Sequence, residues 1–202
     1  MSRNPSFQAM EHTLKKVSAA LRDADVPFLL GGSLASWARG GPETYHDLDF
    51  MLKPDDAERA LQVLVEIGMR PERPPEGWLF KAWDGDVQVD LIFRPKGIEI
   101  TDEVIERGEE LDVLAIRTRV MSLDDMLTTK LLALDEHSLD YSPLLQIARA
   151  LREQIDWDGV HARTAESPYA KAFFTLVEEL GIARTAAQGS GRRSHVRVLD
   201  AS

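Results

Sequence analysis

Three aspartates are the residues of this sequence best suited to do chemistry. Asp47 and Asp49 lie two apart in a run, residues 47–52, whose initial alternation of polar and apolar residues predicts a β-strand. Side chains two apart in a strand project from the same face, so these two carboxylates should lie side by side. Asp90 interrupts the apolar run Val87–Phe93, where a carboxylate is costly to bury unless it is paired or binds a metal. We expect a neighbouring strand to carry Asp90 to the same place.

Carboxylates grouped in this way are ligands for a hard divalent cation. Mg²⁺ in proteins takes one or two carboxylates together with substrate phosphates, and two cations can clamp both oxygens of an in-line phosphoryl displacement. Asp47, Asp49 and Asp90 therefore predict a site for Mg²⁺, or for Mn²⁺ in its place. Other interpretations stay open, because an Asp-x-Asp strand can be a solvated face and Asp90 can face water from an edge strand.

The second feature is the turn Gly31-Gly32-Ser33, which follows the short apolar run 26–30. Glycines let the backbone approach a ligand closely, and amides at a helix start point towards it. Ser33 is expected to cap the helix that follows, and its hydroxyl could bond to a phosphate. A Gly-Gly pair after a strand is more often only a turn. Together with the acids, however, it predicts a site for a metal-bound nucleoside triphosphate (NTP).

Hydrophobic periodicity predicts the elements that position these residues. We expect strands over 26–30, 47–52, 78–83, 87–93 and 114–121, and helices over 6–24, 33–37, 54–67, from Ser122 through Leu134, 143–155 and 168–180. The turn Asp84-Gly85-Asp86 predicts a hairpin, whereas 98–113 gives no clear pattern. Trp78 and Trp83 are expected to pack in the core. The fold class is α+β: a mixed sheet with flanking helices, then a small helical subdomain.

Composition limits the function classes. The chain has 202 residues, no cysteine and a net charge of −10, so thiolate chemistry is excluded and a nucleic-acid contact would have to be local. No apolar run approaches the roughly 18 residues that span a bilayer, and residues 1–10 do not resemble a signal peptide, which favours the cytoplasm. We predict a core over 1–121, a helical subdomain over 122–181 and a flexible tail over 182–202, whose arginines are an incidental or local basic surface.

Residues 26–93 resemble the nucleotidyltransferase superfamily, which includes DNA polymerase β, the kanamycin and lincosamide nucleotidyltransferases and the minimal bacterial enzymes. That superfamily carries a Gly-Gly or Gly-Ser turn, an Asp-x-Asp strand and a third acid on a later strand, which Gly32-Ser33, Asp47-Leu48-Asp49 and Asp90 match in order. The resemblance implies transfer of a nucleoside monophosphate from an NTP to a hydroxyl. It implies that Asp47 and Asp49 bind metal and that Asp90 activates the acceptor.

A second resemblance lies in the helical part. Lys130 in the run Leu127–Leu134, followed by Asp140, is similar to the Lys and Asp motifs of abortive-infection and toxin–antitoxin nucleotidyltransferases. There the Lys binds the triphosphate and the Asp completes the site. Lys130 could equally extend into solvent from a helix face, and Asp140 could merely cap the next helix.

The acceptor stays open among three classes that the resemblance implies. A tRNA or protein acceptor, with a cognate antitoxin as possible partner, is favoured by Lys130 and Asp140. An antibiotic acceptor is the first alternative. The second is a non-catalytic nucleotide-binding or interaction module, against which the presence of all three aspartates argues.

Overall fold

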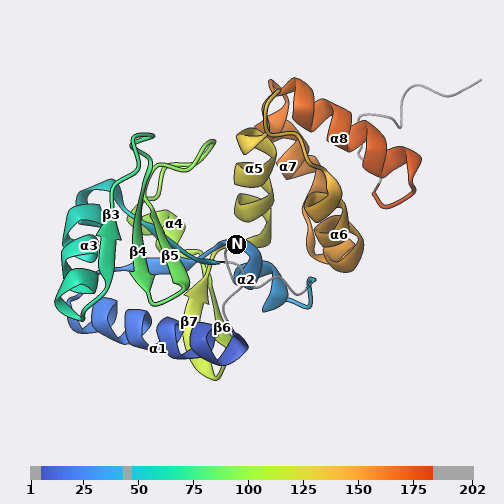
Figure 1. The fold of residues 1–202 in the computed structure, drawn as a ribbon. Coiled ribbons are helices and arrows are strands. Elements are labelled where there is room, and N and C mark those ends of the chain that lie inside the picture. The colour runs from blue at the N-terminus through green and yellow to red at the C-terminus, as the bar shows by residue number, and fades with distance from the viewer. Residues whose placement is uncertain (1–5, 43–46, 184–202) are drawn as a thin grey trace, which may run out of the picture.

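The computed structural model describes residues 6–42 and 47–183, and in these ranges it contains a seven-stranded mixed sheet (Figure 1). The strand order is β3-β4-β5-β2-β1-β7-β6. The strands are β1 (Phe28–Leu30), β2 (Asp47–Leu52), β3 (Arg70–Glu72), β4 (Leu79–Asp84), β5 (Val87–Ile92), β6 (Glu109–Val113) and β7 (Ile116–Val120). The arginine-rich end of the predicted tail lies outside the described residues.

Two parallel pairs lie within this otherwise antiparallel sheet. β2 pairs with β5, and β1 pairs with β7, in parallel. The β2–β5 pair brings together strands separated along the chain by a helix and two other strands. Its register sets Asp49 directly opposite Asp90. The predicted mixed sheet is therefore confirmed, and its central parallel pair is what carries the acids.

Helices cover one face of the sheet and then continue as a separate group at the C-terminal end (Figure 1). α1 and α3 pack against each other and against strands of the sheet. The amphipathic pattern of α1 explains this, because Met10, Leu14, Val17 and Leu21 are fully buried. The helices are α1 (Phe7–Asp23), α2 (Gly32–Trp37), η1 (Pro54–Asp56), α3 (Ala57–Glu66), α4 (Asp102–Glu106), α5 (Leu123–Ala133), α6 (Ser142–Leu151), η2 (Arg152–Gln154), α7 (Trp157–Thr164) and α8 (Pro168–Glu179).

The expected α+β class with C-terminal helices is confirmed, but several local predictions were wrong or incomplete. Ser33 does not cap α2, because that helix already begins at Gly32 and Gly31 is its N-cap. Trp78 is 41% exposed rather than buried in the core. The stretch that gave no pattern contains α4 and β6, and α7 was not expected. Within the described ranges, no helix has the length and apolarity needed to cross a membrane.

An ionic cluster around one buried carboxylate joins the C-terminal helices to the end of α4. Asp125 in α5 is 3% exposed and accepts hydrogen bonds from Arg107 at 2.9 and 3.0 Å. Arg163 of α7 lies 2.7 Å from the same carboxylate. The predicted cap is also present, since Ser122 accepts a hydrogen bond from the backbone N–H of Asp125. These contacts fix the first turn of α5, the helix that carries Lys130 in its last turn.

Candidate active site

The three predicted aspartates meet on one face of the sheet. Carboxylate oxygens of Asp47, Asp49 and Asp90 all lie within 4.8 Å of one another. The alternation of β2 produces half of this arrangement, because Leu48 and Phe50 are fully buried while the alternate residues Asp47 and Asp49 are only partly buried. The parallel pairing with β5 produces the rest by placing Asp90 opposite Asp49. We call these three residues the acidic triad.

The glycine turn packs directly on the triad. The backbone N–H of Gly31 donates to the carbonyl oxygen of Asp49 at 2.8 Å. Gly32 has a φ of +60°, and a Cβ atom added there would overlap the Asp49 carboxylate. Both observations require glycine at position 32, for conformation and for space. Ser33 follows in the first turn of α2, so the turn carries the start of that helix to the triad.

Crowding makes the triad electrostatically unfavourable without a cation. Burial, together with the negative charge of Asp47, raises the pKa of Asp49 to about 7. The positive charges of Lys130 and Lys81 oppose this shift. Burial also raises the pKa of Asp90, against the hydrogen bonds that it accepts from Lys81 and Gln88. Three carboxylates this close need positive charge between them, which is what a divalent cation supplies.

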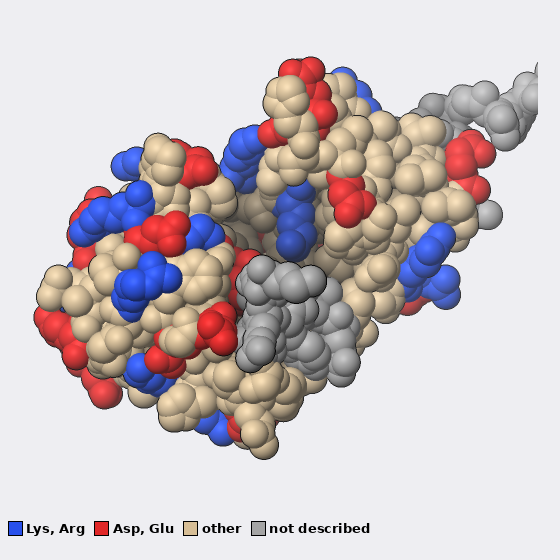
Figure 2. Space-filling view, viewed as in Figure 1, with Lys and Arg blue, Asp and Glu red and all other residues tan. Residues whose placement is uncertain are grey.

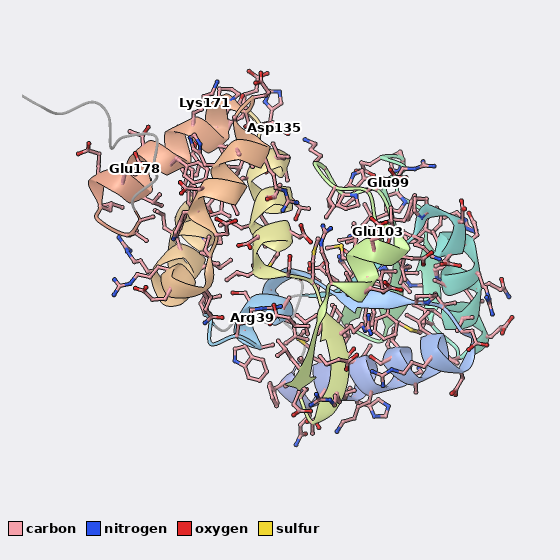
Figure 3. The ribbon with its side chains drawn as sticks, turned by 180° about the vertical axis from the view of Figure 1, so that it is seen from behind. Arg39, Glu99, Glu103, Asp135, Lys171 and Glu178 are labelled. Atoms are coloured by element: carbon pink, nitrogen blue, oxygen red, sulfur yellow. The ribbon has the colours of Figure 1, made fainter. Side chains whose placement is uncertain are left out.

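Lys130 projects from α5 towards the triad, since its charge acts on Asp49. Asp140, by contrast, is not brought there. It is fully exposed in the loop before α6 and accepts a hydrogen bond from the backbone N–H of Ser142 at 2.8 Å. The turn preceding it begins at Asp135, which lies at the end of α5 remote from the sheet (Figure 3). Asp140 therefore shapes the turn that leads into α6, although the N-cap of that helix is Tyr141.

Sequence reasoning missed two side chains that bind Asp90. Lys81 of β4 places its Nζ 3.1 and 3.2 Å from the two Asp90 oxygens, and Gln88 of β5 donates to Oδ1 at 2.8 Å. The hairpin could have revealed Lys81. Counting outwards from the two-residue turn Gly85-Asp86 pairs Asp84 with Val87 and, three steps later, Lys81 with Asp90.

The surface is hollowed between the sheet and the C-terminal helices, with basic side chains on both sides of the hollow (Figure 2). One arginine at the base of the helical part is engaged elsewhere. Arg39, seen near the end of α2 in Figure 3, is 4% exposed and pairs with Glu109 at 3.0 Å. Arg39 is thus a structural link between α2 and β6. His46, which adjoins Asp47 in the sequence, lies outside the described residues.

The acidic triad fits a hard divalent cation on its own chemistry. All its ligand atoms are carboxylate oxygens, and each residue offers one within 4.8 Å of the others. Mg²⁺ and Mn²⁺ prefer such oxygen ligands, and substrate phosphate oxygens complete their coordination. Lys130, whose charge acts on Asp49, offers positive charge for an anion beside the cation. The residues present can therefore hold a metal-bound phosphate compound.

Comparison with known proteins agrees with this geometry. A family model described as an uncharacterised nucleotidyltransferase matches residues 7–179. The fold is similar to that of ANT(2")-Ia in complex with adenylyl-2"-tobramycin, with a TM-score of 0.60 and 16% identity over 83% of this chain and 98% of that one. The solution structure of that antibiotic-resistance factor gives a TM-score of 0.61 at 16% identity, over 87% and 98% of the two chains.

A lincomycin-bound lincosamide adenylyltransferase, LnuA, is more distant, with a TM-score of 0.46 and 15% identity over 72% of this chain and 96% of that one. No curated protein matches the sequence. The family match extends over most of the chain and includes the glycine turn, the acidic triad and Lys130. The chain belongs to this family of nucleotidyltransferases.

Proposed function

We propose that this nucleotidyltransferase is metal-dependent and transfers a nucleoside monophosphate from an NTP to a hydroxyl of a small acceptor molecule. The observation that carries the proposal is the convergence of Asp47, Asp49 and Asp90 within 4.8 Å on one sheet face, against the turn at Gly32. A group of carboxylates this crowded has no structural benefit, because each one raises the cost of ionising the others.

In the proposed reaction the acceptor oxygen forms a bond to the α-phosphorus, and the bond from that phosphorus to pyrophosphate breaks. The acceptor hydroxyl loses its proton, which Asp90 takes, and pyrophosphate leaves with the bonding electron pair. Asp47 and Asp49 would hold Mg²⁺ or Mn²⁺, which neutralises phosphate charge when bound. Gly31, Gly32, Ser33 and Lys130 would position the triphosphate, so catalysis rests on positioning and charge neutralisation.

Three observations support a small acceptor over tRNA or protein. The prediction of a toxin-like acceptor depended on Lys130 and Asp140 together, and the exposed Asp140 carboxylate is bound at the start of α6 instead. The net charge of −10 favours a cationic acceptor over a nucleic acid. The chain covers 98% of ANT(2")-Ia, whose structure contains an adenylylated tobramycin. An antitoxin partner and a cytoplasmic location stay predictions from the sequence.

The test incubates the protein with Mg²⁺ and each α-labelled NTP in turn. One series adds an aminoglycoside and lincosamide panel, a second adds total tRNA and a third adds a protein mixture. We expect label in a small molecule, and none with Asp49→Asn. Label in tRNA or protein would instead support the toxin-like acceptor class. Metal-dependent NTP binding without any transfer would favour a non-catalytic module.

A further inference from the structure

Asp90 differs from the other two members of the triad in being held by a cation of the protein itself. The Lys81 ammonium lies 3.1 and 3.2 Å from its two oxygens, so it contacts both of them at once. Gln88 donates to one of the same oxygens at 2.8 Å. The pair is largely shielded from water, since the two side chains are 22% and 10% exposed.

The contact between Lys81 and Asp90 follows from the strand register of the sheet. Lys81 on β4 is directly opposite Asp90 on β5, and Asp90 is directly opposite Asp49 on β2. Directly opposite residues on paired strands hold their Cβ atoms close together. The three side chains therefore form one row across three strands, and Lys81 cannot leave the site without a change in its own side-chain conformation.

An ammonium in this position competes with a divalent cation. Both need the carboxylate oxygens of Asp90, and like charges repel at this separation. Lys81 offers hydrogen-bond donors and no acceptor, so it cannot itself ligate a metal. Asp47 and Asp49 are the members of the triad that this contact leaves available.

We propose that Lys81 is a positioning residue that occupies Asp90 in the nucleotide-free enzyme and keeps it from binding metal. This inference rests on the proposed function. The free enzyme then binds a divalent cation weakly, through Asp47 and Asp49. Asp90 becomes available for metal or for the acceptor hydroxyl when an incoming triphosphate offers the Lys81 ammonium another anion.

The test measures Mn²⁺ binding by electron paramagnetic resonance without nucleotide, so that it does not depend on turnover. Lys81→Met keeps the length of the side chain but removes its charge and frees both Asp90 oxygens. We expect this variant to bind Mn²⁺ at least about tenfold more tightly than the unaltered protein. Lys81→Gln serves as a second variant, with the same expectation, should the first not fold.

Lys16→Met is the matched control. Lys16 forms a comparable pair with Asp84 at 2.8 Å and is 28% exposed, but it comes from α1 and does not contact the triad. We expect its Mn²⁺ affinity to equal that of the unaltered protein. A gain in both variants would show that general loss of positive charge, rather than the contact with Asp90, is responsible, and would overturn the inference.

Failure of the inference can be distinguished from failure of the proposed function. The role of Lys81 alone is overturned if the Lys81 variants bind Mn²⁺ no more tightly than the unaltered protein, while the unaltered protein binds Mn²⁺ in the presence of an NTP and the Asp49→Asn variant does not. Absence of Mn²⁺ binding in every protein, with and without NTP, overturns the proposed function as well.

Discussion

Asp125 and the acidic triad are both held away from solvent, but they differ in what surrounds them. Asp125 is 3% exposed and lies between two arginines, Arg107 and Arg163. One carboxylate thus receives two positive charges. Arginine suits this role because its planar, permanently charged group binds carboxylates through two parallel hydrogen bonds. These two arginines satisfy Asp125, and the contacts join α5 to the end of α4 and to α7.

The triad has the opposite balance. Three carboxylates within 4.8 Å share the positive charges of Lys81 and Lys130. This shortage of positive charge is reflected in the pKa of Asp49, which burial and the negative charge of Asp47 raise to about 7. Removing one partner of a buried ion pair destabilises the fold, whereas buried charge left short of a partner marks a candidate ligand site. The predictions below separate these two roles.

The largest effect is expected for Asp49→Asn. An amide has nearly the same shape as the carboxylate but no charge to hold a cation, so transfer should fall by about a thousandfold or more, roughly 4 kcal/mol in the barrier. Initial rates with saturating NTP and Mg²⁺ measure this. Thermal melting should show that the variant still folds. Retention of a tenth of the activity would contradict the role of Asp49.

Gly32→Ala should come next, with a loss of about a hundredfold in kcat/KM, roughly 3 kcal/mol. The added methyl group overlaps the Asp49 carboxylate and also forces alanine into a positive φ. Gly68→Ala, just after the end of α3, supplies a control with a positive φ of +89° but no atom within 4 Å of the added Cβ. Comparable losses in both variants would mean that backbone strain, and not displacement of Asp49, is responsible.

Asp125→Asn should show the reverse pattern from Asp49→Asn. Removing the charge leaves Arg107 and Arg163 without their partner, although both can regain water because they are 49% and 36% exposed. We expect a loss of about 2 kcal/mol in the free energy of unfolding, below the range for fully buried pairs. Urea denaturation measures it. Activity well below the unfolding temperature should fall much less than in Asp49→Asn.

The smallest effect concerns pH in the absence of metal. The pKa of Asp49 is about 7 in the folded protein against 3.8 ordinarily, so the folded state binds more protons between these values. The part of the free energy of unfolding that depends on Asp49 should therefore fall as pH rises from about 4 to about 7. The Asp49→Asn variant has no carboxyl at this position to ionise. In the presence of a chelator its Tm should therefore exceed that of the unaltered protein by a few degrees at about pH 8, whereas the two Tm values should agree at about pH 4. An equal difference at both pH values would contradict the shift.

Local patterns were enough to predict the strand of Asp47 and Asp49, because alternation depends only on the residues of one strand. The hairpin containing Asp90 followed from its turn residues in the same way. A neighbouring strand was expected to carry Asp90 to the other two acids, but local alternation could not predict that β5 pairs with β2 in parallel, because the two strands are far apart in the sequence. The contact of Gly32 with Asp49 depends on another pairing, that of β1 with β2, which the sequence pattern did not predict either.

The Asp125 cluster could not be predicted for a related reason. Arg107 comes from the stretch 98–113, which has no clear periodicity, and Arg163 from α7, whose short helix was not recognised. Asp125 itself gave a signal only as an acid in the first turn of a helix, where acids are common. Ion pairs between distant segments leave no trace in local patterns.

The most direct test of the central claim is a crystal structure of the protein with Mn²⁺ and a non-hydrolysable NTP. The account predicts an anomalous manganese peak ligated by Asp47, Asp49 and triphosphate oxygens, with Lys130 contacting a phosphate and the turn at Gly32 beside it. A nucleotide bound elsewhere on the protein, or manganese absent from the acidic triad while the nucleotide is in place, would contradict it.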